Sequence, residues 1–136
     1  MEAIRRGRLP AVSFFKPLGV YNEHPGDAVL MAGEARTARL LAALEKSPQW
    51  PQMLVIVTYD EYGGFWDHVA PPRVDRWGPG SRVPALLISP FSRGGRIEHG
   101  TYDTTSILKL IETRFGLAPL SDRDAKARNL ADVLRF

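Results

Sequence analysis

An unbroken apolar run in the middle of the chain ends abruptly at two carboxylates. The run occupies residues 53–57 and is followed by Asp60, Glu61 and a pair of glycines at 63 and 64. Because it shows no polar alternation and is rich in β-branched residues, it predicts a strand covered on both faces, as in a parallel sheet. Asp60 and Glu61 would then follow the carboxyl end of this strand, where open α/β sheets place their ligands.

The rest of the chain alternates between strand and helix patterns. Apolar runs and helical spacing predict further strands at 9–15 and 83–89, and helices at 27–46, 107–115 and 129–134. Gly116 is expected to end the second of these helices, and Asp103 is expected to cap its start. The order strand, helix, strand in the first half predicts a βαβ unit with a right-handed crossover and a parallel pair of strands.

Length and composition are those of one globular domain. The chain has 136 residues, of which 44% are hydrophobic and 24% are charged, so residues 1–136 are expected to fold as a single domain. No stretch approaches the roughly 18 consecutive apolar residues of a membrane span, and no transmembrane segment is expected. The absence of cysteine excludes disulfides and thiolate metal sites, which leaves Asp, Glu, Asn and His as metal ligands.

The net charge of +3 changes this picture little. The basic residues are spread along the chain among fifteen acidic ones and are not gathered into a stripe. Nucleic-acid binding requires clustered basic residues, and it is therefore not expected.

Two groups of residues carry candidate chemistry. Asp60 and Glu61 are adjacent anions that repel each other unless a cation lies beside them, and a hard divalent metal ion meets this need. The alternative is that they only begin a solvated turn. His24, His68 and His99 all lie in predicted loops, where they are candidates for donating hydrogen bonds to phosphate oxygens or protonating a leaving oxygen. The alternative is that each is a surface residue of its loop.

Several motifs resemble one known family in their order and spacing. They occupy residues 22–26, 58–72, 77–85, 88–91, 102–112 and 129–132. Together they resemble the carboxyl-terminal portion of the bacterial phosphoesterase family that includes phospholipases C and a group of acid phosphatases, related to the alkaline phosphatase superfamily. The resemblance extends from Leu9 to Phe136.

The resemblance implies a fold and an activity. The fold would be a partial alkaline phosphatase-like, mostly parallel sheet flanked by helices, and the activity hydrolysis of phosphate esters or phospholipids with a divalent metal ion. Asp60 and Glu61 match a metal-ligating pair, and His24 matches a histidine that contacts phosphate or assists the leaving group. His68 and His99 match recurrent positions of the family, whose members are commonly exported to the periplasm or the extracellular space.

The chain also departs from the family pattern. Family members are several times longer, and their amino-terminal part supplies a Glu-Asn metal-ligand pair and the serine or threonine nucleophile, neither of which this chain matches. We therefore expect a fragment that requires an amino-terminal companion segment or associates with itself. Two alternatives stay open: a catalytically inactive remnant that binds phosphate-bearing lipids or a partner chain, and an anion-binding regulatory module. Neither the substrate head group nor the metal is specified by these residues.

Overall fold

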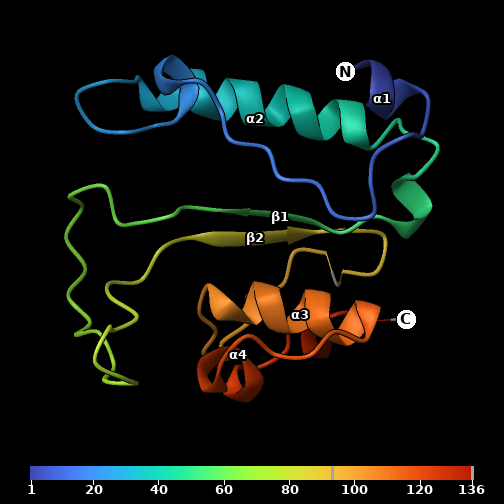
Figure 1. Ribbon diagram of the computed structural model, residues 1–136. Coiled ribbons are helices and arrows are strands. Elements are labelled where there is room, and N and C mark those ends of the chain that lie inside the picture. The colour runs from blue at the N-terminus through green and yellow to red at the C-terminus, as the bar shows by residue number, and fades with distance from the viewer. Residues whose placement is uncertain (93, 136) are drawn as a thin grey trace. The chain divides into compact units, whose positions relative to one another are not determined.

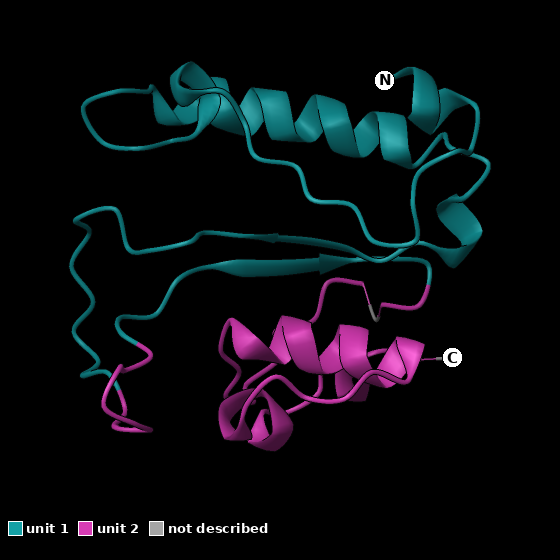
Figure 2. Cartoon of the chain, viewed as in Figure 1, with its two compact units in different colours: residues 1–71, 80–90 teal, residues 72–79, 91–136 magenta. Residues whose placement is uncertain are grey.

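The chain forms a mixed α/β structure of helices and one small sheet. The computed structural model describes residues 1–92 and 94–135, so Arg93 and Phe136 lie outside the described part (Figure 1). It divides into two compact units, which are described separately (Figure 2). Unit 1 comprises residues 1–71 and 80–90, and unit 2 comprises residues 72–79 and 91–136.

The longest element of unit 1 is helix α2, Leu30–Leu44. It is rich in Ala and Leu, which are strong helix formers, and it starts and ends inside the predicted range of 27–46. Helix α1, Glu2–Arg5, packs against it. The Ser47 hydroxyl donates a hydrogen bond to the carbonyl of Ile4 at 2.8 Å, and Ile4 and Leu44 are buried. Short 3-10 helices, η1 (Gly19–Tyr21) and η2 (Trp50–Gln52), flank α2 in sequence.

The sheet of unit 1 corrects the predicted topology. Strand β1, Val55–Thr58, pairs with strand β2, Ala85–Ile88, and the pair is antiparallel, with Val55 opposite Ile88 and Thr58 opposite Ala85. Residues 9–15 do not form a strand. The predictions of a βαβ unit and of a mostly parallel sheet are therefore wrong for the described residues.

The connection between the strands explains the antiparallel pairing. A parallel pair needs a crossover connection, usually a helix. Residues 59–84 contain neither helix nor strand and are rich in proline and glycine. They form a long irregular loop that leads the chain back beside β1 without a crossover helix. The apolar runs identified both strands correctly, but an apolar run carries no information about strand direction.

Unit 2 is helical, and its first helix is capped at both ends as its sequence predicts. Helix α3, Thr105–Phe115, follows Asp103, whose Oδ1 accepts hydrogen bonds from the backbone N–H of Thr105 at 2.7 Å and from its hydroxyl at 2.5 Å. Gly116 ends the helix in the left-handed conformation, with φ of 66°. The expectations for Asp103 as a cap and for Gly116 as a stop are confirmed.

Two shorter elements complete unit 2. Helix α4, Asp122–Lys126, is capped by Ser121, whose hydroxyl accepts a hydrogen bond from the backbone N–H of Arg123. The 3-10 helix η3, Leu130–Val133, lies within the helix predicted at 129–134 and is capped by Asn129. Across the described part of the chain, no helix combines the length and apolarity needed to cross a bilayer.

Replacing Gly116 by alanine is expected to destabilise the protein by about 1–2 kcal/mol, because an L-residue meets a steric penalty in the left-handed conformation. Chemical denaturation measures this loss. Gly19→Ala is the matched control, since Gly19 has no positive φ and a Cβ atom there would meet nothing within 4 Å. Equal stability of the two variants would contradict the assignment of Gly116 as an obligatory stop.

Candidate functional site

The turn after β1 carries the two predicted metal ligands. The side chain of Asp60 is 82% exposed, and its Oδ2 lies 3.7 Å from Nζ of Lys16. Glu61 folds back on its own turn, where Oε2 accepts a hydrogen bond from the backbone N–H of Gly63 at 2.8 Å. Both acids follow the carboxyl end of β1 as the sequence predicts. The antiparallel pairing, however, removes the expectation that several strands converge there.

His24 lies in an exposed loop between η1 and α2. Its backbone N–H donates a hydrogen bond to Oδ1 of Asn22 at 2.9 Å. Its ring Nδ1 lies 2.9 Å from the carbonyl oxygen of Pro25 and 3.5 Å from Oδ2 of Asp27. The side chain is 54% exposed, so a ligand in solution has access to the imidazole.

The structure brings the His24 loop and the Asp60 turn next to each other within unit 1. The Tyr59 hydroxyl donates a hydrogen bond to Oε2 of Glu23. This hydrogen bond and burial raise the pKa of Tyr59 to about 12. Pro25 follows two residues after Glu23 in the same loop. Its Cδ lies 3.4 Å from the position that a Cβ atom on Gly63 would occupy, so the loop also contacts the turn after Asp60. No local pattern in the sequence predicts the Tyr59–Glu23 contact, because these residues lie 36 positions apart.

Asp67 does not use its carboxylate to orient the neighbouring His68. It forms a bidentate salt bridge with Arg82, with distances of 2.9 Å from Nε to Oδ2 and 2.8 Å from Nη2 to Oδ1. It also accepts a hydrogen bond from the backbone N–H of Val69. The Arg82 guanidinium and this amide hold the pKa of Asp67 well below its usual range. Asp67 therefore braces the long loop between the strands, while His68 is exposed.

Replacing Arg82 by glutamine should raise the pKa of Asp67 toward the ordinary aspartate value of 3.8. The charge-assisted pair stabilises the ionised form. Its contribution to stability is present above pH 3.8 and is lost as the pH falls through the lowered pKa. Carboxyl ¹³C NMR titration measures the shift, and Arg96→Gln provides an exposed control. An unchanged Asp67 titration in the Arg82 variant would contradict the role assigned to the pair.

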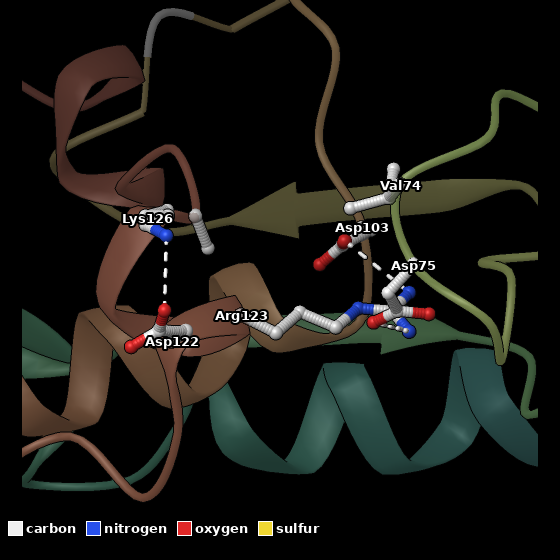
Figure 3. A pocket seen from close by; sticks show the side chains of 7 residues that line it. Val74, Asp75, Asp103, Asp122, Arg123 and Lys126 are labelled. Atoms are coloured by element: carbon white, nitrogen blue, oxygen red, sulfur yellow. Dashed lines mark hydrogen bonds and ion pairs between the residues drawn. The ribbon is translucent and has the colours of Figure 1, made fainter.

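Unit 2 contains His99, which is exposed, and a cavity of about 370 Å³. Arg123 reaches from α4 toward two carboxylates at the cavity, 3.4 Å from Asp75 and 3.6 Å from Asp103 (Figure 3). Asp75 also accepts hydrogen bonds from the backbone N–H groups of Trp77 and Gly78. The carboxylates are thus occupied in tying residues 72–79 to α3 and α4, an arrangement that sequence analysis missed.

The donor set for a metal ion is chemically suitable but small. Carboxylate oxygens of Asp60 and Glu61 are the hard ligands that divalent cations prefer. Among residues 1–92 and 94–135, no group of three or more His, Cys, Asp or Glu side chains is arranged to hold a metal ion. The two acids fit a metal site as a part of its ligand set, and the described residues do not complete that set.

Comparison of the sequence with known proteins shows the family of this chain. The sequence model of the phosphoesterase family matches residues 1–118. Phospholipase C B of Mycobacterium tuberculosis is 35% identical over 161 aligned positions, which cover 98% of this chain and 31% of the relative. Non-hemolytic phospholipase C of Pseudomonas aeruginosa is 31% identical over 86% of this chain and 22% of its own length. Non-specific phospholipase C6 of Arabidopsis thaliana is 32% identical over 95% of this chain and 31% of its own length. The chain thus spans less than a third of these curated relatives, and it belongs to the phosphoesterase family.

Proposed function

We propose that this chain contributes part of the active site of a phosphoesterase of the phospholipase C type, which hydrolyses phosphate esters including phospholipids. The observation that carries this proposal is the placement of Asp60 and Glu61 next to the His24 loop, in a chain that belongs to the phosphoesterase family. The names of the relatives supply the substrate class.

Each residue has a distinct role in this proposal. Asp60 and Glu61 hold part of the coordination sphere of a divalent metal ion, which, when bound, polarises a phosphoryl oxygen and neutralises developing charge. His24 donates a hydrogen bond to a phosphate oxygen or gives a proton to the leaving oxygen. His68 and His99 stay predictions that rest on the family resemblance. Export to the periplasm or the extracellular space is likewise proposed from the family.

The remaining ligands and the hydroxyl nucleophile come, in this proposal, from polypeptide outside the present sequence. Two carboxylates alone bind a metal ion weakly, because each missing anionic ligand removes electrostatic and chelate stabilisation. The chain spans 31% of the length of phospholipase C B, which leaves ample polypeptide in such a relative to supply them. An amino-terminal companion segment is therefore the expected partner.

Hydrolysis assays test the proposal directly. The substrates are p-nitrophenyl phosphate, p-nitrophenyl phosphocholine and phosphatidylcholine, each with and without added Mn²⁺ or Ca²⁺, and with and without the amino-terminal part of a family member. We expect metal-dependent release of p-nitrophenol or diacylglycerol once the two parts are combined. Absence of both hydrolysis and metal binding in the combined preparation would argue against the proposal.

The exposed apolar side chains favour a second candidate function, which is binding of a partner chain. Phe14 is 85% exposed and Trp66 is 89% exposed, and both lie in unit 1. Apolar side chains that lie together at a surface are typical of interaction sites, and Phe15, Leu18 and Val20, which follow Phe14 closely in the sequence, are exposed as well. Sedimentation velocity over a range of concentrations tests this candidate: association supports it, and a monomer at every concentration argues against it.

A further inference from the structure

Glu23 contacts two other segments of unit 1, the residue that follows β1 and helix α2. Its carboxylate accepts the hydrogen bond of the Tyr59 hydroxyl, and Tyr59 immediately precedes Asp60. Its side chain also lies against Gly33 in α2, where a Cβ atom would come within 2.6 Å of Oε1 and 2.8 Å of Cδ. Any residue larger than glycine at position 33 would therefore displace the Glu23 carboxylate.

The backbone of Glu23 is held in an unusual conformation. Among the described residues it is the one non-glycine residue with positive φ, at 64°. A bulky L-residue seldom adopts this conformation, and its persistence requires support from surrounding contacts. The hydrogen bond from Tyr59 and the space at Gly33 provide that support.

These contacts lie directly beside His24 in the chain. His24 follows Glu23 directly, and its backbone N–H is bound by the Asn22 side chain. The next residue, Pro25, lies beside Gly63 in the turn that carries Glu61. The loop is thus attached to the end of β1 through Glu23 and contacts the following turn through Pro25. An exposed loop without these attachments would sample many positions relative to the carboxylates.

We propose that Glu23 and Tyr59 are positioning residues that hold His24 next to the Asp60–Glu61 turn, and that glycine is required at position 33 to leave room for the Glu23 carboxylate. The inference deepens the proposed phosphoesterase function and depends on it for its catalytic meaning. A loop already held in place loses less conformational freedom when His24 engages a phosphate group. Neither positioning residue needs to touch the substrate.

A spin label measures this placement without metal, substrate or turnover. The chain has no cysteine, so a Tyr62→Cys variant accepts a single nitroxide in the turn after Asp60. Tyr62 is exposed. Paramagnetic broadening of the His24 ring protons falls with the sixth power of their distance from the label. We expect strong broadening in the labelled parent and a several-fold loss of it in Tyr59→Phe and in Gly33→Ala.

Conservative variants separate positioning from general stability. Glu23→Gln keeps an oxygen that accepts the Tyr59 hydrogen bond, and it should retain the broadening. Glu23→Gly removes the acceptor but favours the positive φ, so it should keep the fold and lose the broadening. Tyr21→Phe and Gly19→Ala are matched controls that should retain it, since Tyr21 is exposed and Gly19 has open space around it.

The outcomes are decisive in both directions. Retained broadening in Tyr59→Phe or in Glu23→Gly, with the amide signals of α2 unchanged, overturns the proposal. Equal loss in the two control variants also overturns it, because the effect would then be general loosening. Loss confined to Tyr59→Phe, Gly33→Ala and Glu23→Gly establishes the positioning role. Failure of the hydrolysis assays does not alter this distance measurement, so failure of the proposed function is distinguished from failure of this inference.

Discussion

Replacing Asp60 by asparagine is expected to weaken binding of divalent metal ions, and to slow any metal-dependent phosphate ester hydrolysis, by about a hundredfold or more. Loss of a group that only supports a metal ligand already costs about 10–100-fold in affinity or activity, and loss of a charged ligand costs at least as much. Asparagine has nearly the same shape as aspartate, so the change removes the negative charge with little disturbance of the turn. Isothermal titration with Mn²⁺ measures the binding, and p-nitrophenyl phosphocholine hydrolysis by the combined preparation measures the rate.

The matched control is Asp122→Asn in unit 2. The side chain of Asp122 is 93% exposed and pairs with Lys126 one helical turn away. Both variants lose one exposed carboxylate and the same unit of charge. If Asp122→Asn weakens Mn²⁺ binding as much as Asp60→Asn does, the effect reflects net charge, and the assignment of Asp60 as a ligand fails.

Replacing Glu112 by glutamine is expected to stabilise the protein at neutral pH, with an increase of several degrees in the unfolding temperature. Glu112 lies in α3 and is buried, and neither of its carboxylate oxygens has a hydrogen-bond partner in the described structure. Burial raises the pKa of Glu112, and the adjacent carboxylate of Asp124 raises it further. Nearby Lys109 opposes these effects only in part, since its ammonium donates a hydrogen bond to the carbonyl of Ala125.

The raised pKa fixes the sign of the pH dependence. The stability contributed by the protonated Glu112 side chain is fully present below pH 4.5, its unfolded value, and is lost as the pH rises through the raised pKa. Asp124 acts in the opposite direction. The Ser121 hydroxyl lowers its pKa to about 2, so the contribution of Asp124 is present above pH 3.8 and is lost as the pH falls toward 2.

Thermal unfolding followed by circular dichroism from pH 3 to pH 8 tests this prediction. The unfolding temperature of the unaltered chain should fall as the pH rises through the pKa of Glu112, and that fall should be absent in Glu112→Gln. Below pH 4.5 the two proteins should differ little, because both side chains are then neutral. Glu45→Gln, at the exposed end of α2, is the control. A parallel fall in the Glu112→Gln variant would show that another group titrates.

The sequence predicts the position of the two carboxylates of the candidate site but does not establish their role. The apolar run at 53–57 located β1 to within two residues, and Asp60 and Glu61 follow its end as expected. Their role as metal ligands stays a prediction. Open sheets of parallel strands place ligands at the carboxyl ends of the strands, but β1 and β2 are antiparallel, so the position of the two acids at the end of β1 no longer supports that role. The remaining support comes from the ordered motifs and from membership of the phosphoesterase family.

The sequence by itself determined the features that depend on neighbouring residues. These are the two apolar runs that form β1 and β2, the start of α3 at its Asp103 cap, its end at Gly116, and the order of motifs that identifies the family. Periodicity, capping and turn preferences act over a few neighbouring residues, so the amino-acid sequence alone is enough to recognise them.

Only the tertiary structure decided the direction of the strands and the contacts between distant side chains. The Tyr59–Glu23 hydrogen bond spans 36 positions, the Asp67–Arg82 pair spans 15, and Arg123 meets Asp75 across 48. Each contact forms because the backbone between the two residues takes a path that no local pattern specifies. Pairing of this kind depends on how the whole unit packs, and it therefore becomes visible only when the chain is folded.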